Sequence, residues 1–444
     1  MDVHIINLGC ARNQVDSEIM AGRLAQAGHV MVEDPDAAEA IVINTCCFIE
    51  DAANESIDTI LAAAACKETG RCRRLIVAGC LPERYREAVR EALPEADLFL
   101  GTGAYDQIVA SLEAAATGPA ACLLPDPDDL APQTADTPRR RSPGPMAYLK
   151  IAEGCDRHCT FCIIPRLRGR QKSRPLDAVV AEARTLFRAG VQEVVLVGQE
   201  TTRYGRDRSA GETLAALLRE LSAVAGRRWV RFMYGHPESL SDEIVQTVAA
   251  RPNLCPYFDI PIQHVSPALL KRMGRPYDPE RIAERVGYIR GAIPQAALRT
   301  TVIVGFPGET DQEFEQLQQF IRTVPFDHLG VFTYSDAEDL ASHRLPDHVP
   351  AAIARRRRDA LMEQQKGISE MRNRAYLDTI QDVLLESSPE PGLFIGRTML
   401  QAPEVDGLTY VHTEPRHGEN PAPGDFVRAR IVDTLEYDLV GQTL

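Results

Sequence analysis

The 444-residue sequence predicts an α/β chain of three domains: an N-terminal parallel-sheet α/β domain, a central partial (β/α)6 barrel and a small C-terminal five-stranded antiparallel β-barrel. The length exceeds what one hydrophobic core usually serves, which favours several domains. Strand and helix patterns alternate over residues 3–91 and again over residues 148–332, as is typical of parallel sheets covered by helices. Residues 379–441 instead contain short strands separated by turn residues, which is the pattern of a small barrel.

The N-terminal domain, which we place at residues 1–118, has three aliphatic strands that alternate with three helices. The strands are predicted at residues 3–8, 40–45 and 74–78. The helices are predicted at residues 16–27, 52–65 and 83–91. This βαβαβα order implies a parallel sheet with helices on its faces.

Three cysteines, Cys10, Cys46 and Cys80, each stand just past the C-terminal end of one of these strands. Ligands of open parallel sheets bind at that edge, so the three thiols are expected to converge although they are far apart in sequence. Three thiolates suit a 4Fe–4S cluster that keeps one iron open. The alternative is three buried structural cysteines, because cysteine is common in protein cores.

The central domain, which we place at residues 144–375, contains six strand–helix units. Its strands are predicted at residues 148–151, 193–197, 230–234, 257–260, 299–304 and 328–332. Its helices are predicted at residues 177–189, 214–225, 241–250, 267–273, 279–292 and 312–324, followed by a charged helical connection at residues 355–374. Six such units build a partial barrel, and ligands of barrels bind at the C-terminal ends of the strands.

A cysteine-rich loop follows the first of these strands. Cys155, Cys159 and Cys162 have the spacing C-x3-C-x2-C, and the aromatic residue Phe161 precedes the last cysteine. Closely spaced thiolates on one loop can hold three corners of a cubane and leave one iron open. A zinc site is the alternative, but zinc favours C-x2-C pairs, and only His158 offers a fourth ligand. The loop resembles that of radical S-adenosylmethionine (SAM) enzymes, which implies that SAM binds the open iron.

The resemblance also suggests a role in SAM binding for two glycine-containing loops at strand ends. Gly198, Gln199 and Glu200 follow the second strand of the barrel, and Gly305 and Gly308 follow the fifth. Glycine lets a flat, polar cofactor approach the backbone closely. Each loop alone indicates only a tight turn, but beside the cluster loop these five residues are expected to contact SAM.

Two basic runs flank the cluster loop in sequence. The first, Arg139 to Arg141, lies in a segment at residues 119–143 that is rich in proline and aspartate and is predicted to be a linker or an extended crossing segment. That run could contact nucleic acid, but we interpret it as solvated. The second run, Arg166 to Arg174, faces either an anionic group of the substrate or solvent.

The C-terminal domain, which we place at residues 376–444, is acidic. Of the net charge of −14, residues 1–115 carry −10 and residues 376–444 carry −8, which leaves +4 for the middle of the chain. Strands are predicted at residues 379–385, 393–397, 409–412, 426–432 and 438–441. Small barrels often bind nucleic acid, but an acidic one favours a basic partner over a polyanion. The alternative is that the acidic surface simply keeps the protein soluble.

The order of the three domains resembles the methylthiotransferase family of radical-SAM enzymes, whose terminal barrel is the TRAM domain. The segment NLGCARNQVDSE at residues 7–18 is similar to the branch of this family that modifies a ribosomal protein. The tRNA-modifying branch usually has Gln after the first cysteine, where this chain has Ala11. The segments APEVDG at residues 402–407 and EYDLVG at residues 436–441 also resemble the ribosomal-protein branch.

The resemblance implies methylthiolation of the β-carbon of an aspartate in small-subunit ribosomal protein S-twelve, with two 4Fe–4S clusters and two molecules of SAM. The cluster of the C-x3-C-x2-C loop would cleave SAM with one electron, and the resulting 5′-deoxyadenosyl radical would remove a hydrogen atom from the substrate. The N-terminal cluster would hold or supply the sulfur, and a second SAM would supply the methyl group. No residue beyond the cluster ligands is assigned a catalytic role.

The acidic terminal barrel would then bind the basic ribosomal protein. The surface charges expected to contribute to this binding are those of Glu404, Asp406, Glu436 and Asp438. The main alternative is a tRNA adenosine methylthiotransferase, which would be expected to have a basic terminal barrel. An iron–sulfur electron carrier is the alternative that is not an enzyme, but a carrier needs neither an open iron nor a large barrel.

The composition predicts a cytoplasmic protein. The sequence contains no run of eighteen apolar residues and no basic, apolar leader, so neither a membrane span nor a membrane partner is expected. Eleven cysteines in such a chain favour metal or redox chemistry over disulfides. An electron donor such as flavodoxin or ferredoxin is an expected partner.

Overall fold

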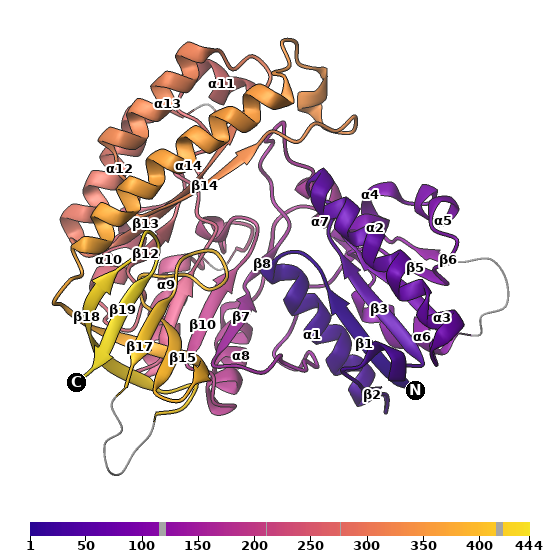
Figure 1. Cartoon of the computed structure of the whole chain (residues 1–444). Coiled ribbons are helices and arrows are strands. Elements are labelled where there is room, and N and C mark those ends of the chain that lie inside the picture. The colour runs from indigo at the N-terminus through magenta and orange to yellow at the C-terminus, as the bar shows by residue number, and fades with distance from the viewer. Residues whose placement is uncertain (115–120, 210, 276, 414–420) are drawn as a thin grey trace.

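Six parallel strands form the N-terminal sheet in the computed structural model of the chain, which describes residues 1–114, 121–209, 211–275, 277–413 and 421–444 (Figure 1). The strand order is β2-β1-β3-β4-β5-β6. The bounds are β1 Asp2–Asn7, β2 Val30–Met31, β3 Ala40–Thr45, β4 Arg74–Gly79, β5 Leu98–Leu100 and β6 Ala121–Leu123. Strand β3 is buried over its whole length because it pairs with parallel neighbours on both edges and has packed residues on both faces. The predicted parallel sheet is confirmed.

The helices of this domain differ from the prediction in two places. Their bounds are α1 Ala11–Gln26, α2 Glu50–Ala64, α3 Cys66–Thr69, α4 Cys80–Tyr85, α5 Ala88–Ala92 and α6 Ile108–Glu113. Helix α1 begins five residues before the predicted start at residue 16, because Ala11 and Val15 are buried against the central barrel and extend the helix through a polar first turn. The helix predicted at residues 83–91 is interrupted at Arg86, which has a φ of +50°. The predicted boundary at residues 118–119 lies outside the described residues.

The segment after the N-terminal domain is not a solvated linker. It adds β6 to the sheet and then crosses α1, where a Cβ atom at Gly22 would lie 2.5 Å from the backbone nitrogen of Arg139. The side chain of Arg139 is 8% exposed and forms ion pairs with Glu18 at 2.5 Å and Glu182 at 2.7 Å. The interpretation of this arginine as solvated is therefore wrong, because its charge is neutralised by carboxylates from two domains.

The central domain is the predicted partial (β/α)6 barrel, which is confirmed. Its two parallel sheets have the orders β11-β10-β7 and β12-β13-β14, and an isolated bridge from Val230 to Leu254 connects them. The strands are β7 Met146–Lys150, β10 Glu193–Val197, β11 Trp229–Phe232, β12 Tyr257–Asp259, β13 Ala297–Val304 and β14 His328–Thr333, with a short hairpin of β8 Ala152–Glu153 and β9 Lys172–Ser173. The helices are α7 Ile164–Arg168, α8 Leu176–Arg188, α9 Leu214–Ala225, α10 Asp242–Ala249, α11 Pro267–Arg272, α12 Pro279–Ala292, α13 Asp311–Thr323 and α14 Ala351–Arg374.

Residues on the barrel strands alternate between two cores. On β10, Val194 and Leu196 pack against the outer helices, whereas Val195 and Val197 face inward. The inward core also contains Ala11 and Val15 of α1 and, from the C-terminal domain, Leu384, Leu400 and Ala402. The three domains therefore share this one hydrophobic cluster, in addition to the cores that each domain forms by itself.

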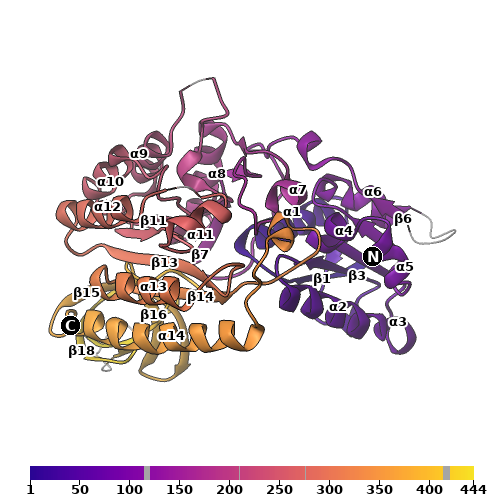
Figure 2. The same ribbon diagram turned by 90° about the horizontal axis from the view of Figure 1, so that it is seen from above.

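The C-terminal domain is a closed five-stranded barrel of order β15-β16-β17-β19-β18, packed beside α14 (Figures 1 and 2). The bounds are β15 Ile380–Glu390, β16 Leu393–Thr398, β17 Thr409–His412, β18 Phe426–Thr434 and β19 Leu439–Thr443. The predicted small barrel is confirmed. Four of the five pairings are antiparallel, but β17 and β19 are parallel because β18 lies between them in sequence and on the far side of β19. None of the helices in the described ranges is long and apolar enough to cross a membrane.

A buried ion cluster connects the C-terminal barrel to the N-terminal ends of the central strands. Glu193, at the start of β10, accepts hydrogen bonds from Arg231 at 2.7 Å and Arg397 at 2.6 Å, and all three side chains are at most 1% exposed. Burial raises the pKa of Glu193, but the two guanidinium groups lower it more, so its net shift is downward. The carboxylate therefore stays ionised at neutral pH and holds the two domains together.

We predict that Glu193→Gln destabilises the protein by about 3–5 kcal/mol, because buried Arg231 loses its carboxylate partner and buried Arg397 keeps only Glu386, at 2.6 Å. The measurement is the midpoint of urea unfolding. The matched control is Glu243→Gln, which breaks an exposed pair with Arg219 and should cost less than about 1 kcal/mol.

The same pair of variants gives a pH test. Because the folded pKa of Glu193 is lowered, its stabilisation is complete above the unfolded value of about 4.3 and is lost as the pH falls toward the lower folded value. The difference in stability between wild type and Glu193→Gln should therefore shrink in acid. Equal stability of the two proteins at pH 7 would contradict the structural role of the cluster.

Candidate active site

All six predicted ligand cysteines line one cavity of about 740 Å³, between the N-terminal domain and the C-terminal ends of the barrel strands. The segments after β10, β11 and β12, together with Arg275 and Phe332, complete its wall on the barrel side, and residues 403–405 of the C-terminal domain close it. The structure thus brings together two cysteine triads that are separated by up to 152 positions in sequence. Their convergence makes this cavity the candidate active site.

The first triad depends on two glycines at strand ends. Gly9 precedes Cys10 with a φ of +98°, and a Cβ atom there would lie 2.7 Å from the Cβ atom of Cys46. Gly79 precedes Cys80 with a φ of +99°, and a Cβ atom there would lie 2.4 Å from the side-chain oxygen of Asn44. Both positions need a left-handed backbone and close approach, which only glycine permits without strain.

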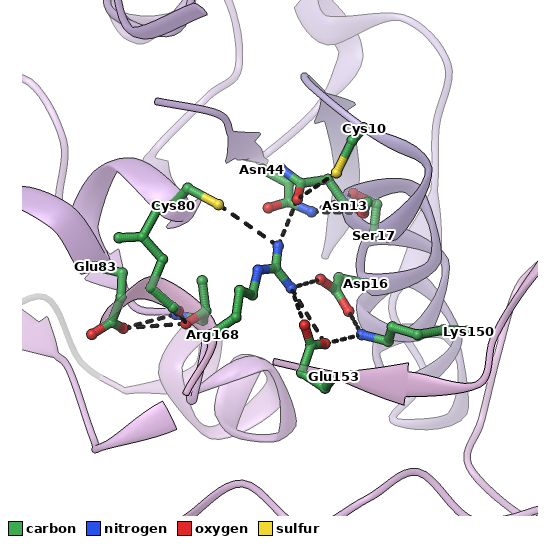
Figure 3. Close-up of polar contacts among 12 residues, drawn as sticks. Cys10, Asn13, Asp16, Ser17, Asn44, Cys80, Glu83, Lys150, Glu153 and Arg168 are labelled. Atoms are coloured by element: carbon green, nitrogen blue, oxygen red, sulfur yellow. Dashed lines mark hydrogen bonds and ion pairs between the residues drawn. The ribbon is translucent and has the colours of Figure 1, made fainter. Parts of the chain in front are cut away.

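Two buried asparagines bind the strand ends of this triad to α1 (Figure 3). The Asn13 amide donates to the backbone oxygens of Leu8 at 3.1 Å and Thr45 at 2.9 Å, which lie two residues before Cys10 and one residue before Cys46. The Asn44 amide donates to the Asn13 backbone oxygen at 2.8 Å and to Ser17 Oγ at 2.9 Å. These bonds position the ends of β1 and β3 relative to the first turn of the helix.

The second triad sits on a loop with its own backbone supports. The Cys155 amide donates to the Gly169 oxygen at 3.1 Å, and the Cys162 amide donates to the Cys159 oxygen at 3.1 Å. Arg275 Nε donates to Cys159 Sγ at 3.3 Å. The ring of Phe161 lines the cavity, as its place in the motif predicts for a residue that shields a cluster.

A buried network around Arg168 joins Cys80 of the first triad to Glu153, which lies two residues before Cys155 of the second (Figure 3). Its guanidinium donates to Asp16 at 2.7 Å and to Asn13 Oδ1 at 2.6 Å, and it lies 3.7 Å from Cys80 Sγ. Lys150 also contacts Asp16, and it pairs with Glu153 at 2.6 Å. The residues come from β7, β8, α7 and α1, so the network joins the N-terminal domain to the barrel at the strand that leads into the cluster loop.

The second basic run thus has internal partners. Arg168 is 3% exposed and pairs with Asp16, and Arg174 is also 3% exposed and pairs with Glu182 at 2.6 Å. Neither of the two alternatives considered for this run holds for these arginines, because their charges are used between domains rather than on substrate or in solvent. Arg166, 60% exposed, and Arg170, which is also exposed, face solvent to a large extent.

Burial and neighbouring charges shift the pKa of Cys10 in the opposite direction from the pKa values of four other ligand thiols. Burial raises the pKa of Cys155 to about 11 and those of Cys162 and Cys80 to about 12. Burial also raises the pKa of Cys46. For Cys10 burial acts in the same direction, but the guanidinium groups of Arg12 and Arg168 outweigh it, so the pKa of this thiol is lowered.

The five predicted SAM contacts divide into two groups. Gln199 and Glu200 line the cavity, and the Gly198 oxygen accepts a hydrogen bond from Arg12 in its wall. Gly305 and Gly308 lie outside the described lining of the cavity. A Cβ atom at Gly305 would lie 2.4 Å from the Cβ atom of Ala354, and one at Gly308 would lie 2.0 Å from the Arg272 guanidinium, so both glycines permit local packing.

Three polar atoms in the cavity wall have no hydrogen-bond partner among the described residues: Gln199 Oε1, His236 Nε2 and Gln263 Oε1. Burial, followed by the charges of Arg275 and Arg157, lowers the pKa of His236 to about 2, so its ring is neutral. Its Nδ1 accepts from the Glu238 amide at 3.3 Å, which assigns the proton to Nε2. The wall therefore offers one donor and two acceptors to a polar ligand.

Backbone strain gathers at the same cavity. Of the six described non-glycine residues with positive φ, three line it: Tyr234 at +61°, Gln263 at +65° and Glu404 at +66°. Strained residues persist only where the surrounding structure holds them, and they cluster at functional sites. Neither these residues nor Arg275 has a sequence pattern that would reveal its place, whereas Arg12 and Asn13 are signalled by their adjacency to Cys10.

The C-terminal domain contributes Pro403, Glu404 and Val405 to the cavity wall. The loop contacts both edge strands of the open barrel: Tyr148 of β7 donates to Glu404 at 2.8 Å, and His328 of β14 lies 3.6 Å from Asp406. Asp406 is only 1% exposed and also accepts from Tyr257 at 2.6 Å. Its expected role as a surface charge for docking is therefore wrong, because it anchors the loop inside the barrel.

The residues of both triads fit 4Fe–4S clusters. Each triad supplies three thiols to a shared cavity, and three thiolates leave one iron of a cubane open. In the described parts of the chain, no three Cys, His, Asp or Glu side chains are gathered closely enough for a single metal ion. The unpartnered wall atoms fit a polar ligand between the two triads.

The fold and the cavity define the chain as a radical SAM enzyme with a domain added at each end. Three family models match it: the uncharacterized protein family UPF0004 at residues 2–101, the radical SAM superfamily at residues 149–321 and the TRAM domain at residues 379–444. Among solved structures, the radical SAM methyltransferase TsrM from Kitasatospora setae shares the fold with a TM-score of 0.55, at 16% identity over 74% of this chain and 72% of that one.

Similar curated proteins span the full length of the chain. The ribosomal protein uS12 methylthiotransferase RimO of Desulfosudis oleivorans is 50% identical over 100% of both chains. The proteins of the same name from Geobacter sulfurreducens and Clostridioides difficile are 44% and 43% identical, over 100% of this chain and 98% and 99% of theirs. The chain belongs to the RimO family of methylthiotransferases, which confirms the resemblance seen in the sequence.

We predict that the reconstituted protein holds about eight irons and that replacing Cys155, Cys159 and Cys162 together by Ala leaves about four. The measurement is iron and sulfide content after anaerobic reconstitution. Cys122→Ala is the matched control, since this half-buried thiol lies outside the described cavity lining and should keep about eight. If the triple variant kept all its iron, these cysteines would not be the ligands.

Proposed function

We propose that this protein methylthiolates the β-carbon of an aspartate in ribosomal protein uS12, using two 4Fe–4S clusters and two molecules of SAM. One observation carries the proposal: both cysteine triads line a single cavity, so a sulfur carrier and a SAM-cleaving cluster would face the same substrate. The names of full-length relatives support the substrate. The ribosomal protein is made in the cytoplasm, where we place the enzyme, and a flavodoxin or ferredoxin would supply electrons.

The two cysteine triads of the cavity would have different roles. Cys155, Cys159 and Cys162 would hold the cluster that binds SAM, and Cys10, Cys46 and Cys80 would hold the second cluster. When bound, the groups supply one-electron cleavage of SAM and a site for sulfur, which no side chain can provide. Gln199, His236 and Gln263 orient SAM, because their free polar atoms point to a ligand in this cavity.

The protein itself protects this chemistry from water. The cavity wall is largely apolar, and its aromatic residues include Phe161 and Tyr234. Phe161 packs edge-on against Phe306, with ring centroids 6.4 Å apart. A dry, rigid wall limits side reactions of a radical and positions the substrate close to it.

The rim of the cavity fits a protein substrate. Three of its lining residues are large, exposed apolar side chains, one from each domain: Phe48 is 42% exposed, Phe332 50% and Val405 45%. Exposed apolar groups that gather at a cavity mouth are typical of an interaction site. We propose that they contact the chain of the ribosomal protein on either side of its target aspartate.

Charge favours the ribosomal protein over tRNA. The C-terminal domain carries −8, and its exposed acidic residues include Asp433 and Glu436, although Glu436 is paired with Lys366 at 2.6 Å. This domain repels a polyanion and attracts a basic protein. The tRNA alternative therefore lacks the basic terminal barrel that it would be expected to have.

We expect the reconstituted enzyme, SAM and a reductant to add one methylthio group to an aspartate of uS12 and none to tRNA. The measurement is mass spectrometry of both substrates. Cys80→Ala should lose the product while SAM cleavage continues, because the cluster on Cys155, Cys159 and Cys162 would be untouched. Methylthioadenosine in the tRNA would assign the chain to the other activity, and full product from Cys80→Ala would refute the sulfur-carrying role.

Phe332→Ala should raise the KM for uS12 about fivefold and leave kcat nearly unchanged, because the rim contact is worth about 1 kcal/mol of uniform binding. Steady-state methylthiolation at several uS12 concentrations measures this. Val30→Ala is the control, since Val30 is 57% exposed on β2 and is not part of the cavity lining. A fall in kcat at constant KM would show that Phe332 does not act in docking.

A further inference from the structure

Four arginines line the described cavity wall: Arg12, Arg157, Arg168 and Arg275. Arg157 is neutralised by Glu200 at 2.8 Å and Glu238 at 2.7 Å, and Arg168 is neutralised by Asp16. Among the described residues, the other two have no carboxylate partner. Apart from the cysteine sulfurs beside them, Cys10 and Cys159, these two guanidinium groups have no acidic partner in the described chain and can still pair with a carboxylate.

Arg12 is the less committed of these two. Its Nη1 donates to the Gly198 backbone oxygen at 3.0 Å, and its guanidinium stacks over the Tyr234 ring at 4.4 Å from the centroid. It also lies beside the Cys10 thiol. Arg275, in contrast, donates to Cys159 Sγ and to the Pro261 oxygen, so it serves the loop of the second triad.

The contacts of Arg12 hold it in one place between the two domains. It stands in the first turn of α1 in the N-terminal domain, yet both its hydrogen bond and its ring contact are to residues at the strand ends of the barrel. Tyr234 is itself held in place: its backbone is strained, with a φ of +61°, and its backbone N–H donates a hydrogen bond to the Asp259 carboxylate at 3.0 Å. The guanidinium is thus preorganised, and most of its five N–H donors stay available.

We propose that Arg12 is the substrate-binding residue that recognises the side-chain carboxylate of the target aspartate. A guanidinium matches a carboxylate with two parallel hydrogen bonds, which fix the plane of the acid as well as its position. The carboxyl carbon of aspartate is bonded directly to its β-carbon, so holding the carboxylate also fixes the carbon that loses hydrogen. The inference rests on the proposed function and adds the group that selects an acidic side chain.

The preference for aspartate over asparagine follows from the burial of the Arg12 guanidinium. A buried guanidinium that has no carboxylate partner binds a carboxylate much better than its amide analogue, because the amide brings no negative charge to the cavity. An aspartate would therefore be modified and an asparagine at the same position would be rejected. The same charge would serve no purpose for a neutral nucleobase.

The test compares two uS12 substrates, one with the target aspartate and one with asparagine in its place, in competition on the same enzyme preparation. Wild type should prefer aspartate by about 10- to 100-fold in kcat/KM, the range for a hydrogen-bonded charge pair. Arg12→Met should bring this preference close to one, chiefly by slowing the aspartate substrate. Arg12→Lys should restore part of it. Loss of folded or cluster-loaded protein cancels, because both substrates meet the same enzyme.

Arg157→Met is the matched control, since it removes a guanidinium of the same cavity that already has carboxylate partners. It should slow both substrates alike and keep the preference for aspartate. A preference that survives in Arg12→Met would overturn the role of Arg12, as would an equal slowing of both substrates by that variant. If wild type modified neither uS12 substrate, the proposed function itself would be refuted.

Discussion

The buried pairing of Arg168 with Asp16 is the interaction on which the rest of the site depends. Asp16 lies on α1, one helical turn and a half beyond Cys10, while Arg168 follows the loop of the other triad. Lys150 and Glu153 enclose the pair. Burial raises the pKa of Glu153, but the charges of Lys150 and Arg168 lower it more, so its carboxylate stays ionised. Removing one member would leave an uncompensated buried charge, so the two domains are held in one relative position. That position decides the distance between the two triads.

The rest of the architecture supports this joint. Arg139 in the crossing segment pairs with Glu18 and Glu182, and Glu193 holds the C-terminal barrel through Arg231 and Arg397. An apolar core contributed by all three domains lies between these ionic contacts. A cavity built at such a junction can be both rigid and asymmetric, with one triad on each side, a strained loop of the terminal barrel in its wall and an apolar rim at its mouth. These are the conditions that a radical reaction on a large substrate requires.

Local sequence patterns predicted much of the fold. The strands of the barrel were predictable because aliphatic runs separated by amphipathic helices are strong signals, and strand β10 and helices α9 and α12 have the predicted bounds. The start of α1 was not predictable, because its first turn is polar and is stabilised by packing of Ala11 and Val15 against another domain. Strands of two or three residues such as β2 and β5 carry too short a pattern. The parallel pairing of β17 and β19 depends on how the chain closes a barrel, which no local pattern reports.

The sequence by itself determined the ligand cysteines that we propose, the family and the class of chemistry, because the loop spacing and the position of thiols at strand ends are local properties. Only the tertiary structure decided what surrounds them. Arg139 and Asp406 were read as surface charges but are buried between domains, and Gly305 and Gly308 support packing rather than the cavity. Arg12, Tyr234 and Glu404 meet at one wall from three domains. The sequence shows which side chains are charged. Only the folded chain shows whether a charged side chain lies beside a group of opposite charge that neutralises it.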